Sequence, residues 1–134
     1  MAGEHVVVLY DEDCRWCRWS VARLVPFDRD RRLRLVPIQG PEGDRLLAGV
    51  PEAERLASAH AVTPDGCVHS GGDAAAPIAA ALPALSFGAP LLRALPGPTR
   101  AAYGLVAGNR SRLGRRLDDD AIEKADRLIA SRRG

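Results

Sequence analysis

The chain has 134 residues, of which 46% are hydrophobic, 27% charged and 4% aromatic, and its formal net charge is +2. This composition is typical of one soluble globular domain, and it excludes a disordered tail, a collagen-like repeat and a small scaffold held by disulfides. Of the 19 basic residues only Lys124 is a lysine, and the small net charge does not indicate a nucleic-acid partner.

The sequence shows no targeting signal and no transmembrane segment. Its N-terminus has no basic start, and the apolar run at residues 6–9 is too short for the core of a signal peptide. Residues 74–98 carry one charge, Arg93, but prolines interrupt them repeatedly, so we expect buried or interfacial helices there. We therefore expect a cytoplasmic protein, in which three cysteines do not form a framework of structural disulfides.

The first third of the chain predicts a strand, a helix and a second strand. Residues 6–10 form a continuous apolar run, which is typical of a central strand covered on both faces. A helix with apolar residues at helical spacing is expected from about residue 14 to Pro26. Residues 33–38 form the next strand, and the internal Pro37 predicts an edge position. Such a strand-helix-strand unit is right-handed and pairs its strands in parallel.

The middle of the chain predicts two short helices and a hairpin. The helices are expected at residues 44–48 and 52–57. Residues 60–63 and 67–69 flank a Pro-Asp-Gly turn between β-capable segments, which is typical of a hairpin.

The rest of the chain predicts helices. Asp73 is expected to cap a helix over residues 74–82, and Thr99 a helix that runs to about residue 109. Residues 118–129 are amphipathic, with acidic residues at the start that complement a helix dipole. The order of all these elements predicts an α/β fold, namely a thioredoxin-like β-α-β-β-β-α core with additional C-terminal helices.

Cys14 and Cys17 lie where the first predicted strand passes into the first helix. At a helix N-terminus, unpaired N–H groups and the helix dipole favour a thiolate, and Arg15 and Arg18 add to this effect while the acidic residues before them oppose it. Cys17 follows one turn later on the apolar stripe. We expect Cys14 to be the exposed attacking thiol, Cys17 the shielded resolving thiol, and Trp16 a substrate contact between them.

The third cysteine leaves a metal-binding interpretation open. Cys67 and His69 can complete a zinc ligand set begun by Cys14 and Cys17. In a thioredoxin-like sheet, however, the turn before Cys67 lies at the end opposite the cysteine pair. Cys67 is therefore predicted to be a buried structural residue, and we expect no metal and no other cofactor.

The chain also contains four motifs in a fixed order: Asp11-Glu-Asp-Cys14-Arg-Trp-Cys17, Pro64-Asp-Gly66, Gly72-Asp-Ala74 and Tyr103-Gly-Leu-Val-Ala-Gly-Asn109-Arg110. Together they resemble the DCC family (DUF393) of thiol-disulfide oxidoreductases over residues 5–116. The resemblance implies a thioredoxin-like fold and a dithiol-disulfide activity. The family's DxDCxxC signature is matched by Asp11, Asp13, Cys14 and Cys17, whereas Glu12 stands where glycine is usual.

The domain limits and one departure also follow from this resemblance. We expect a thioredoxin-like DCC domain over residues 1–116 and an amphipathic helical tail over residues 117–134. Thioredoxins have a cis-proline before the third core strand, but residues 56–59 contain no proline. This departure weakens the implication of general protein-disulfide reduction.

Arg110 is a candidate supporting residue. It lies about two helical turns after Tyr103, so the two side chains share a helix face. Arg110 can reach Asp11 or Asp13 from there and hold the cysteine loop, but a solvated arginine at a helix C-terminus, with Asn109 as the cap, is the favoured interpretation. The Arg-rich segments are expected to be solvated faces that bind no nucleic acid.

These observations predict an enzyme in which Cys14 attacks a disulfide and Cys17 resolves the mixed disulfide. The expected substrate is a disulfide-containing protein or a small thiol compound, and the reductant is not identified by the sequence. Two other functions stay open: a zinc or iron module that uses the same cysteines, and a non-catalytic thioredoxin-like interaction domain.

Overall fold

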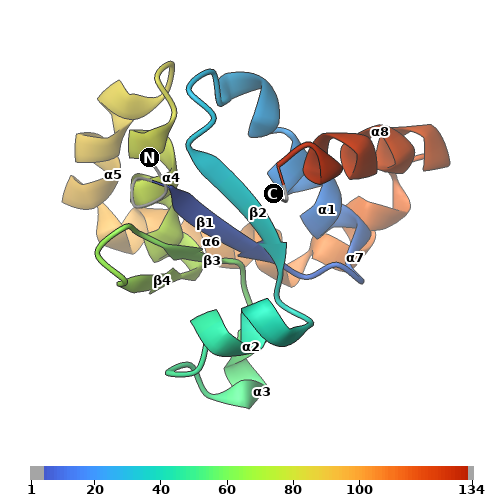
Figure 1. Cartoon of the computed structure of the whole chain (residues 1–134), viewed down its shortest axis with the longest axis horizontal. Helices are drawn as coiled ribbons and strands as arrows, with labels where there is room; N and C mark the ends of the chain where they lie inside the picture. Colours follow the sequence, from blue (N-terminus) through green and yellow to red (C-terminus); the bar gives the residue numbers. More distant parts are fainter. Residues whose placement is uncertain (1–4, 133–134) are drawn as a thin grey trace.

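The computed structural model describes residues 5–132, which contain one four-stranded mixed sheet (Figure 1). Its strands are β1 (Val6–Tyr10), β2 (Leu33–Pro37), β3 (His60–Val62) and β4 (Val68–Ser70), in the order β2-β1-β3-β4. β1 pairs in parallel with β2 and antiparallel with β3, and β3 pairs antiparallel with β4. This arrangement agrees with the predicted α/β, thioredoxin-like core, and the strand that contains Pro37 lies at an edge as predicted.

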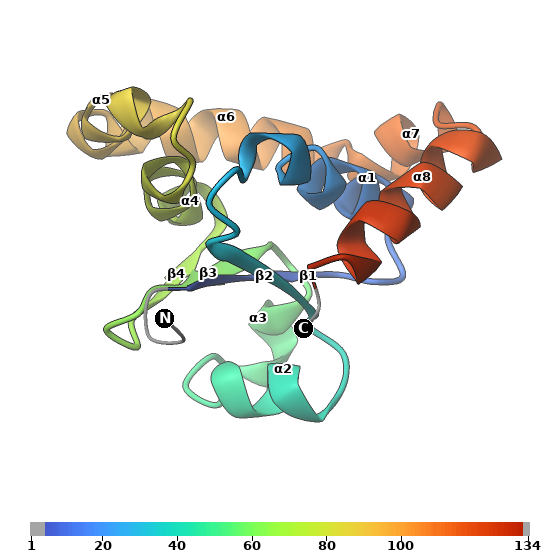
Figure 2. The same cartoon turned by 45° about the horizontal axis from the view of Figure 1, so that its top comes forward.

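The helices cover the two faces of the sheet unequally, as the nearly edge-on view of Figure 2 shows. Below the sheet in this view lie α2 (Pro41–Leu46) and α3 (Glu52–Arg55). Above it lie α1 (Arg15–Ala22), α4 (Ala75–Ala81), α5 (Ala89–Ala94), α6 (Pro96–Gly108), α7 (Arg110–Arg115) and α8 (Asp119–Ala130). Short 3-10 turns complete the chain: η2 (Val25–Phe27), η3 (Gly71–Ala74) and η4 (Ser86–Gly88).

β1 is buried on both faces, as its continuous apolar sequence predicts. Val6, Val8 and Tyr10 belong to the larger core cluster, together with residues of α1, α4 and α8. Val7 and Leu9 point the other way, into a smaller cluster with residues of β2 and the α2 side. The carboxyl end of β1 is therefore packed on both faces of the sheet. The loop that continues from it, residues 11–14, is the cysteine loop.

The C-terminal helix α8 packs against α1. Its buried residues are Ile122, Ala125 and Ile129, and its N-cap Asp118 accepts a hydrogen bond from the Ala121 N–H at 2.8 Å. The predicted amphipathic helix is therefore present, and it packs on the helix that carries the cysteine pair. The division of the chain after residue 116 stays a prediction.

Three predicted helix starts are wrong. α2 begins at Pro41 and α6 at Pro96, because proline suits the first turn of a helix, where its missing N–H costs no hydrogen bond. Thr99 therefore lies inside α6 and donates its hydroxyl to the Leu95 carbonyl at 2.7 Å. Asp73 does not cap α4, since its carboxylate instead accepts a hydrogen bond from Arg100 Nε at 2.7 Å.

Cys67 is exposed, which contradicts its predicted burial. It follows the hairpin turn and precedes the edge strand β4, where only one neighbouring strand covers the backbone. Its N–H donates to Asp65 Oδ1 at 3.1 Å, and its carbonyl accepts from Thr63 N–H at 3.1 Å. The turn chemistry was predicted correctly, but the same turn holds Cys67 at the surface.

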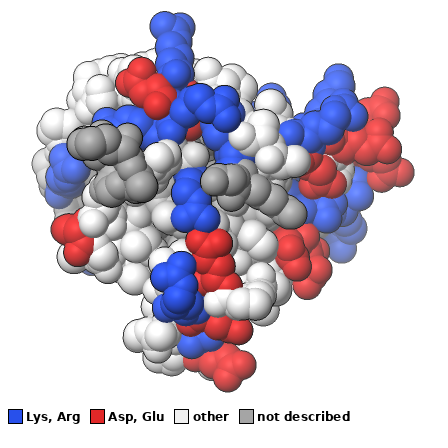
Figure 3. All heavy atoms as spheres, viewed as in Figure 1, with Lys and Arg blue, Asp and Glu red and all other residues white. Residues whose placement is uncertain are grey.

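No helix within residues 5–132 is long and apolar enough to cross a membrane. On the face that Figure 3 shows, basic and acidic side chains are interspersed. That face has no broad basic surface of the kind that binds nucleic-acid backbones.

Candidate active site

Cys14 is the N-cap of α1, directly after the loop that leaves β1. Its backbone is extended, with φ −100° and ψ 117°, and its Sγ accepts a hydrogen bond from the Cys17 N–H at 3.2 Å. Its own N–H donates to the Asp11 carbonyl at 3.2 Å. The sulfur of Cys14 therefore occupies the place of a capping oxygen, where helix N–H groups stabilise negative charge.

Cys17 is held as a neutral thiol. Cys14 and Cys17 are both free thiols of intermediate exposure, so exposure does not separate them. Burial, and next the hydrogen bond to Cys14, raise the pKa of Cys17 to about 12, while the Arg110 guanidinium opposes this rise. This raised pKa keeps Cys17 a neutral thiol at neutral pH in the dithiol form.

Arg110 contacts Cys17 and not the aspartates that were its candidate partners. Its Nη1 lies 3.9 Å from Cys17 Sγ, and its Nη2 donates to the Leu56 carbonyl at 2.9 Å. The cause lies in the helix break at Asn109: α6 ends there and Arg110 begins α7, so the guanidinium does not continue the α6 face. The candidate contacts with Asp11 and Asp13 are therefore wrong.

Gln39 takes the role for which Arg110 was a candidate. Its Nε2 donates to Asp11 Oδ1 at 2.7 Å, and its Oε1 accepts from the Glu12 N–H at 3.1 Å. Asp11 Oδ1 also accepts from the Asp13 N–H at 3.0 Å, which closes the loop. Sequence reasoning missed Gln39, although a signal existed: it follows β2, whose carboxyl end lies beside that of the parallel strand β1.

Replacing Gln39 by leucine is expected to lower the free energy of unfolding by about 1 to 2 kcal/mol, because it removes hydrogen bonds to a carboxylate and to a backbone N–H. Gln39→Glu should cost more at pH 7, since it places a carboxylate against Asp11. Urea denaturation of both variants at pH 7 and near pH 4 tests this. If Gln39→Glu were no less stable than Gln39→Leu at pH 7, Gln39 would not be bonded to the cysteine loop.

Arg15 connects the cysteine helix to the segment between α7 and α8. Its Nη2 donates to the Leu117 carbonyl at 2.6 Å and its Nε to the Gly114 carbonyl at 3.3 Å. Helices α1 and α7 lie close together at Gly114. A Cβ atom at this position would lie only 3.2 Å from the backbone nitrogen of Trp16. The guanidinium of Arg15 is thus bound to the C-terminal segment, and its effect on a Cys14 thiolate stays a prediction.

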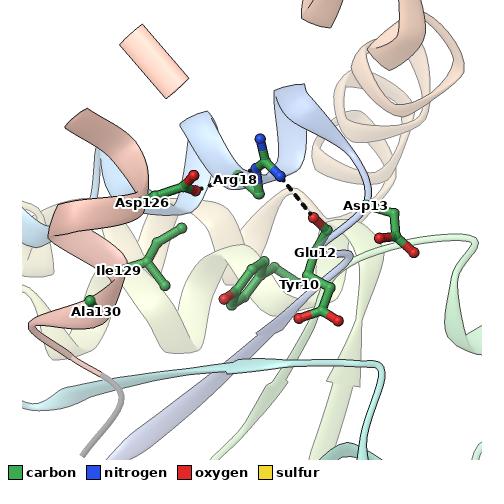
Figure 4. Close-up of a pocket in the computed structure, with 7 residues that line it drawn as sticks. All are labelled: Tyr10, Glu12, Asp13, Arg18, Asp126, Ile129 and Ala130. Carbon is green, nitrogen blue, oxygen red and sulfur yellow. Dashed lines mark hydrogen bonds and ion pairs between the residues drawn. The ribbon is translucent and has the colours of Figure 1, made fainter. Parts of the chain in front are cut away.

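Arg18 makes a similar connection beside a hollow lined by residues of β1, the loop after it, α1 and α8 (Figure 4). Its Nη1 donates to the Glu12 carbonyl at 3.3 Å, and its Nε lies 3.4 Å from Asp126 Oδ1 of α8. The hollow has a volume of about 450 Å³, and neither Cys14 nor Cys17 lines it. Arg18 therefore joins the cysteine loop to α8, and the arginine that contacts a site sulfur is Arg110.

A smaller apolar cavity of about 210 Å³ does reach a cysteine. Its lining includes Trp16, Cys17, Tyr103, Val106 and Arg110. The Trp16 ring also packs on the Trp19 ring, with centroids 4.9 Å apart. The cavity brings together three of the predicted site residues, Trp16, Cys17 and Arg110, whereas Asp11 and Asp13 act on the loop outside it.

Tyr103 fixes one wall of this cavity. Its hydroxyl accepts a hydrogen bond from the Ala59 N–H at 2.7 Å, which ties α6 to the residue before β3. Burial raises the pKa of Tyr103 above its ordinary value, so the phenol is neutral over the physiological range. Tyr103 and Arg110 line the same cavity from two helices, α6 and α7, and not from one helix face as predicted.

The geometry does not support the predicted metal-binding alternative. β1 and β3 are antiparallel with Leu9 opposite His60 and Val7 opposite Val62, so the turn before Cys67 lies at the sheet end remote from Cys14. Within residues 5–132, no group of three or more His, Cys, Asp or Glu side chains is placed to hold a metal ion.

One comparison with known proteins gives a match. A family model described as DCC1-like thiol-disulfide oxidoreductase matches residues 8–116. The comparisons with curated proteins and with solved structures give no significant match.

Proposed function

Because the chain belongs to the DCC1-like thiol-disulfide oxidoreductase family, we propose that it exchanges a Cys14–Cys17 dithiol with the disulfide of a substrate. One observation supports this most strongly: Cys14 Sγ sits at the N-cap of α1 and accepts the Cys17 N–H at 3.2 Å. That position stabilises an attacking or leaving thiolate at Cys14 and keeps the second thiol one turn away.

The exchange takes place in two steps. The Cys14 thiolate attacks one substrate sulfur, so a Cys14–substrate bond forms, the substrate S–S bond breaks and the other substrate sulfur leaves as a thiolate. Cys17 then loses its proton to solvent and attacks Cys14 Sγ, which releases the first substrate sulfur and forms the Cys14–Cys17 disulfide. Two electrons pass from the protein to the substrate, and two external thiols or one dithiol, which become a disulfide, return them and restore the protein dithiol.

Arg110 and the two aspartates of the cysteine loop have supporting roles in this proposal. The guanidinium 3.9 Å from Cys17 Sγ stabilises the thiolate that forms during the second step. Asp11 and Asp13, held through Gln39, fix the loop from which Cys14 starts. We place this chemistry in the cytoplasm, where a reducing environment keeps the pair as a dithiol; its substrates are protein disulfides or small disulfides.

The raised pKa of Cys17 gives a pH dependence that tests the two roles. Iodoacetamide is expected to modify Cys14 before Cys17 at pH 7, and the rate at Cys17 should rise about tenfold per pH unit towards its pKa of about 12. Because the folded protein keeps Cys17 protonated more strongly than the unfolded chain does, the free energy of unfolding should be constant below the ordinary pKa of 9.0. It should fall as the pH rises from 9.0 to about 12. Peptide mapping of labelled protein measures both rates. Equal labelling at pH 7, with a plateau for Cys17 below pH 9, would contradict the assignment.

A further inference from the structure

The apolar cavity beside Cys17 has the size of one small chemical group. Its volume of about 210 Å³ lies below the range of about 300 to 1,000 Å³ that is typical of pockets for whole ligands. It can therefore hold only part of a substrate, such as a single aromatic ring or a short branched chain. Trp16, Tyr103 and Val106 provide apolar walls from two helices, α1 and α6.

The charge at this cavity is positive. Among the described residues that line it, Arg110 alone is charged. Its polar contacts are the Leu56 carbonyl at 2.9 Å and Cys17 Sγ at 3.9 Å, and neither partner is a carboxylate. A guanidinium has five N–H donors, so further donors remain for a ligand. A carboxylate is the group that fits such a planar cation beside an apolar wall.

The cavity also lies beside the resolving cysteine. Cys17 forms part of its lining, so a group bound there lies next to Cys17, whose N–H bonds to Cys14 Sγ. We propose that the cavity selects small disulfides in which the group beside the sulfur is compact and apolar and carries a carboxylate bound by Arg110. This inference rests on the proposed function, because it names the substrate class of the same dithiol.

A matched pair of disulfides tests the role of Arg110. The disulfides of para-mercaptobenzoic acid and of para-mercaptobenzamide have nearly the same shape and differ in charge. The ratio of their rate constants with the reduced protein, measured by thiol release, should fall about tenfold or more in Arg110→Met. Arg112→Met is the control, since it removes the same charge from an exposed position of α7 and should leave the ratio unchanged.

A second pair of variants tests the apolar part. Val106→Trp should fill the cavity and slow the benzamide disulfide several-fold relative to hydroxyethyl disulfide, which has no ring. Leu105→Trp is its control, because Leu105 is 70% exposed and does not line the cavity. A ratio that stays the same in Val106→Trp would overturn this part.

A ligand without sulfur separates this inference from the proposed function. para-Methylbenzoate should quench the tryptophan fluorescence of the wild-type dithiol protein and bind at least tenfold more weakly to Arg110→Met. Absence of benzoate binding, or a charge ratio unaffected by Arg110→Met, overturns the carboxylate site. Benzoate binding without any disulfide exchange keeps the site and overturns the proposed redox function.

Discussion

Replacing Cys14 by serine is expected to reduce disulfide exchange on the order of a thousandfold or more, because a hydroxyl at this position does not ionise and cannot form the mixed disulfide. The rate is measured as thiol release from hydroxyethyl disulfide by the reduced protein. Cys17→Ser should retain the first step and accumulate a mixed disulfide at Cys14, since the resolving thiol is missing. Mass spectrometry then detects the protein carrying one substrate thiol.

The third cysteine provides the control for both variants. Cys67 is exposed and lies at the far end of the hairpin, so Cys67→Ser should exchange at the wild-type rate. Its removal also prevents side reactions at an exposed thiol. Wild-type turnover in Cys14→Ser, or a mixed disulfide found at Cys17 in the wild-type protein, would contradict the assigned roles.

Asp28→Ala is expected to lower the free energy of unfolding by about 3 to 5 kcal/mol, the cost of leaving the partners of a buried carboxylate unpaired. Asp28 is 1% exposed. Its carboxylate accepts from the Arg32 and Leu33 N–H groups at 2.8 and 3.1 Å, and Arg132 Nε lies 3.2 Å away. These contacts join the start of β2 to the second residue after α8, so their loss should loosen α8 from α1 as well.

Urea denaturation measures this loss of stability, and two further variants serve as comparisons. Asp28→Asn keeps acceptor capacity but loses the charge, so it should fall between the wild type and Asp28→Ala. Asp30→Ala removes an exposed acid of the same turn and should change the stability by less than about 0.5 kcal/mol. Equal stability of Asp28→Ala and Asp30→Ala would show that the buried ion pair does not hold the two segments together.

The sequence was informative for several features that neighbouring residues determine. The apolar run of β1, the Pro-Asp-Gly turn and the placement of Cys14 before a helix follow from side-chain alternation, turn geometry and capping, all set by neighbouring residues. For the same reason the proline at residue 37 predicted an edge strand correctly.

The errors at the site concern contacts between residues far apart in the chain, whereas the helix starts at Pro41 and Pro96 were missed despite a local signal. Arg110 lies 93 residues from the sulfur that it contacts, and Gln39 lies 28 residues from Asp11. Which partner each side chain reaches depends on where α6 ends and how β2 aligns with β1, and no local pattern specifies either. Asp28 shows the same limit, since its ion-pair partner Arg132 lies 104 residues further along the chain.

The most direct test is the stoichiometry of a single exchange in the Cys67→Ser protein. The reduced protein is mixed with one equivalent of hydroxyethyl disulfide, the released thiol is counted and the protein is mapped by mass spectrometry. We predict two thiols released per protein and a Cys14–Cys17 disulfide with no substrate attached. Release of one thiol with a stable adduct on either cysteine, or no reaction at all, would contradict the proposal that this pair is a dithiol-disulfide couple.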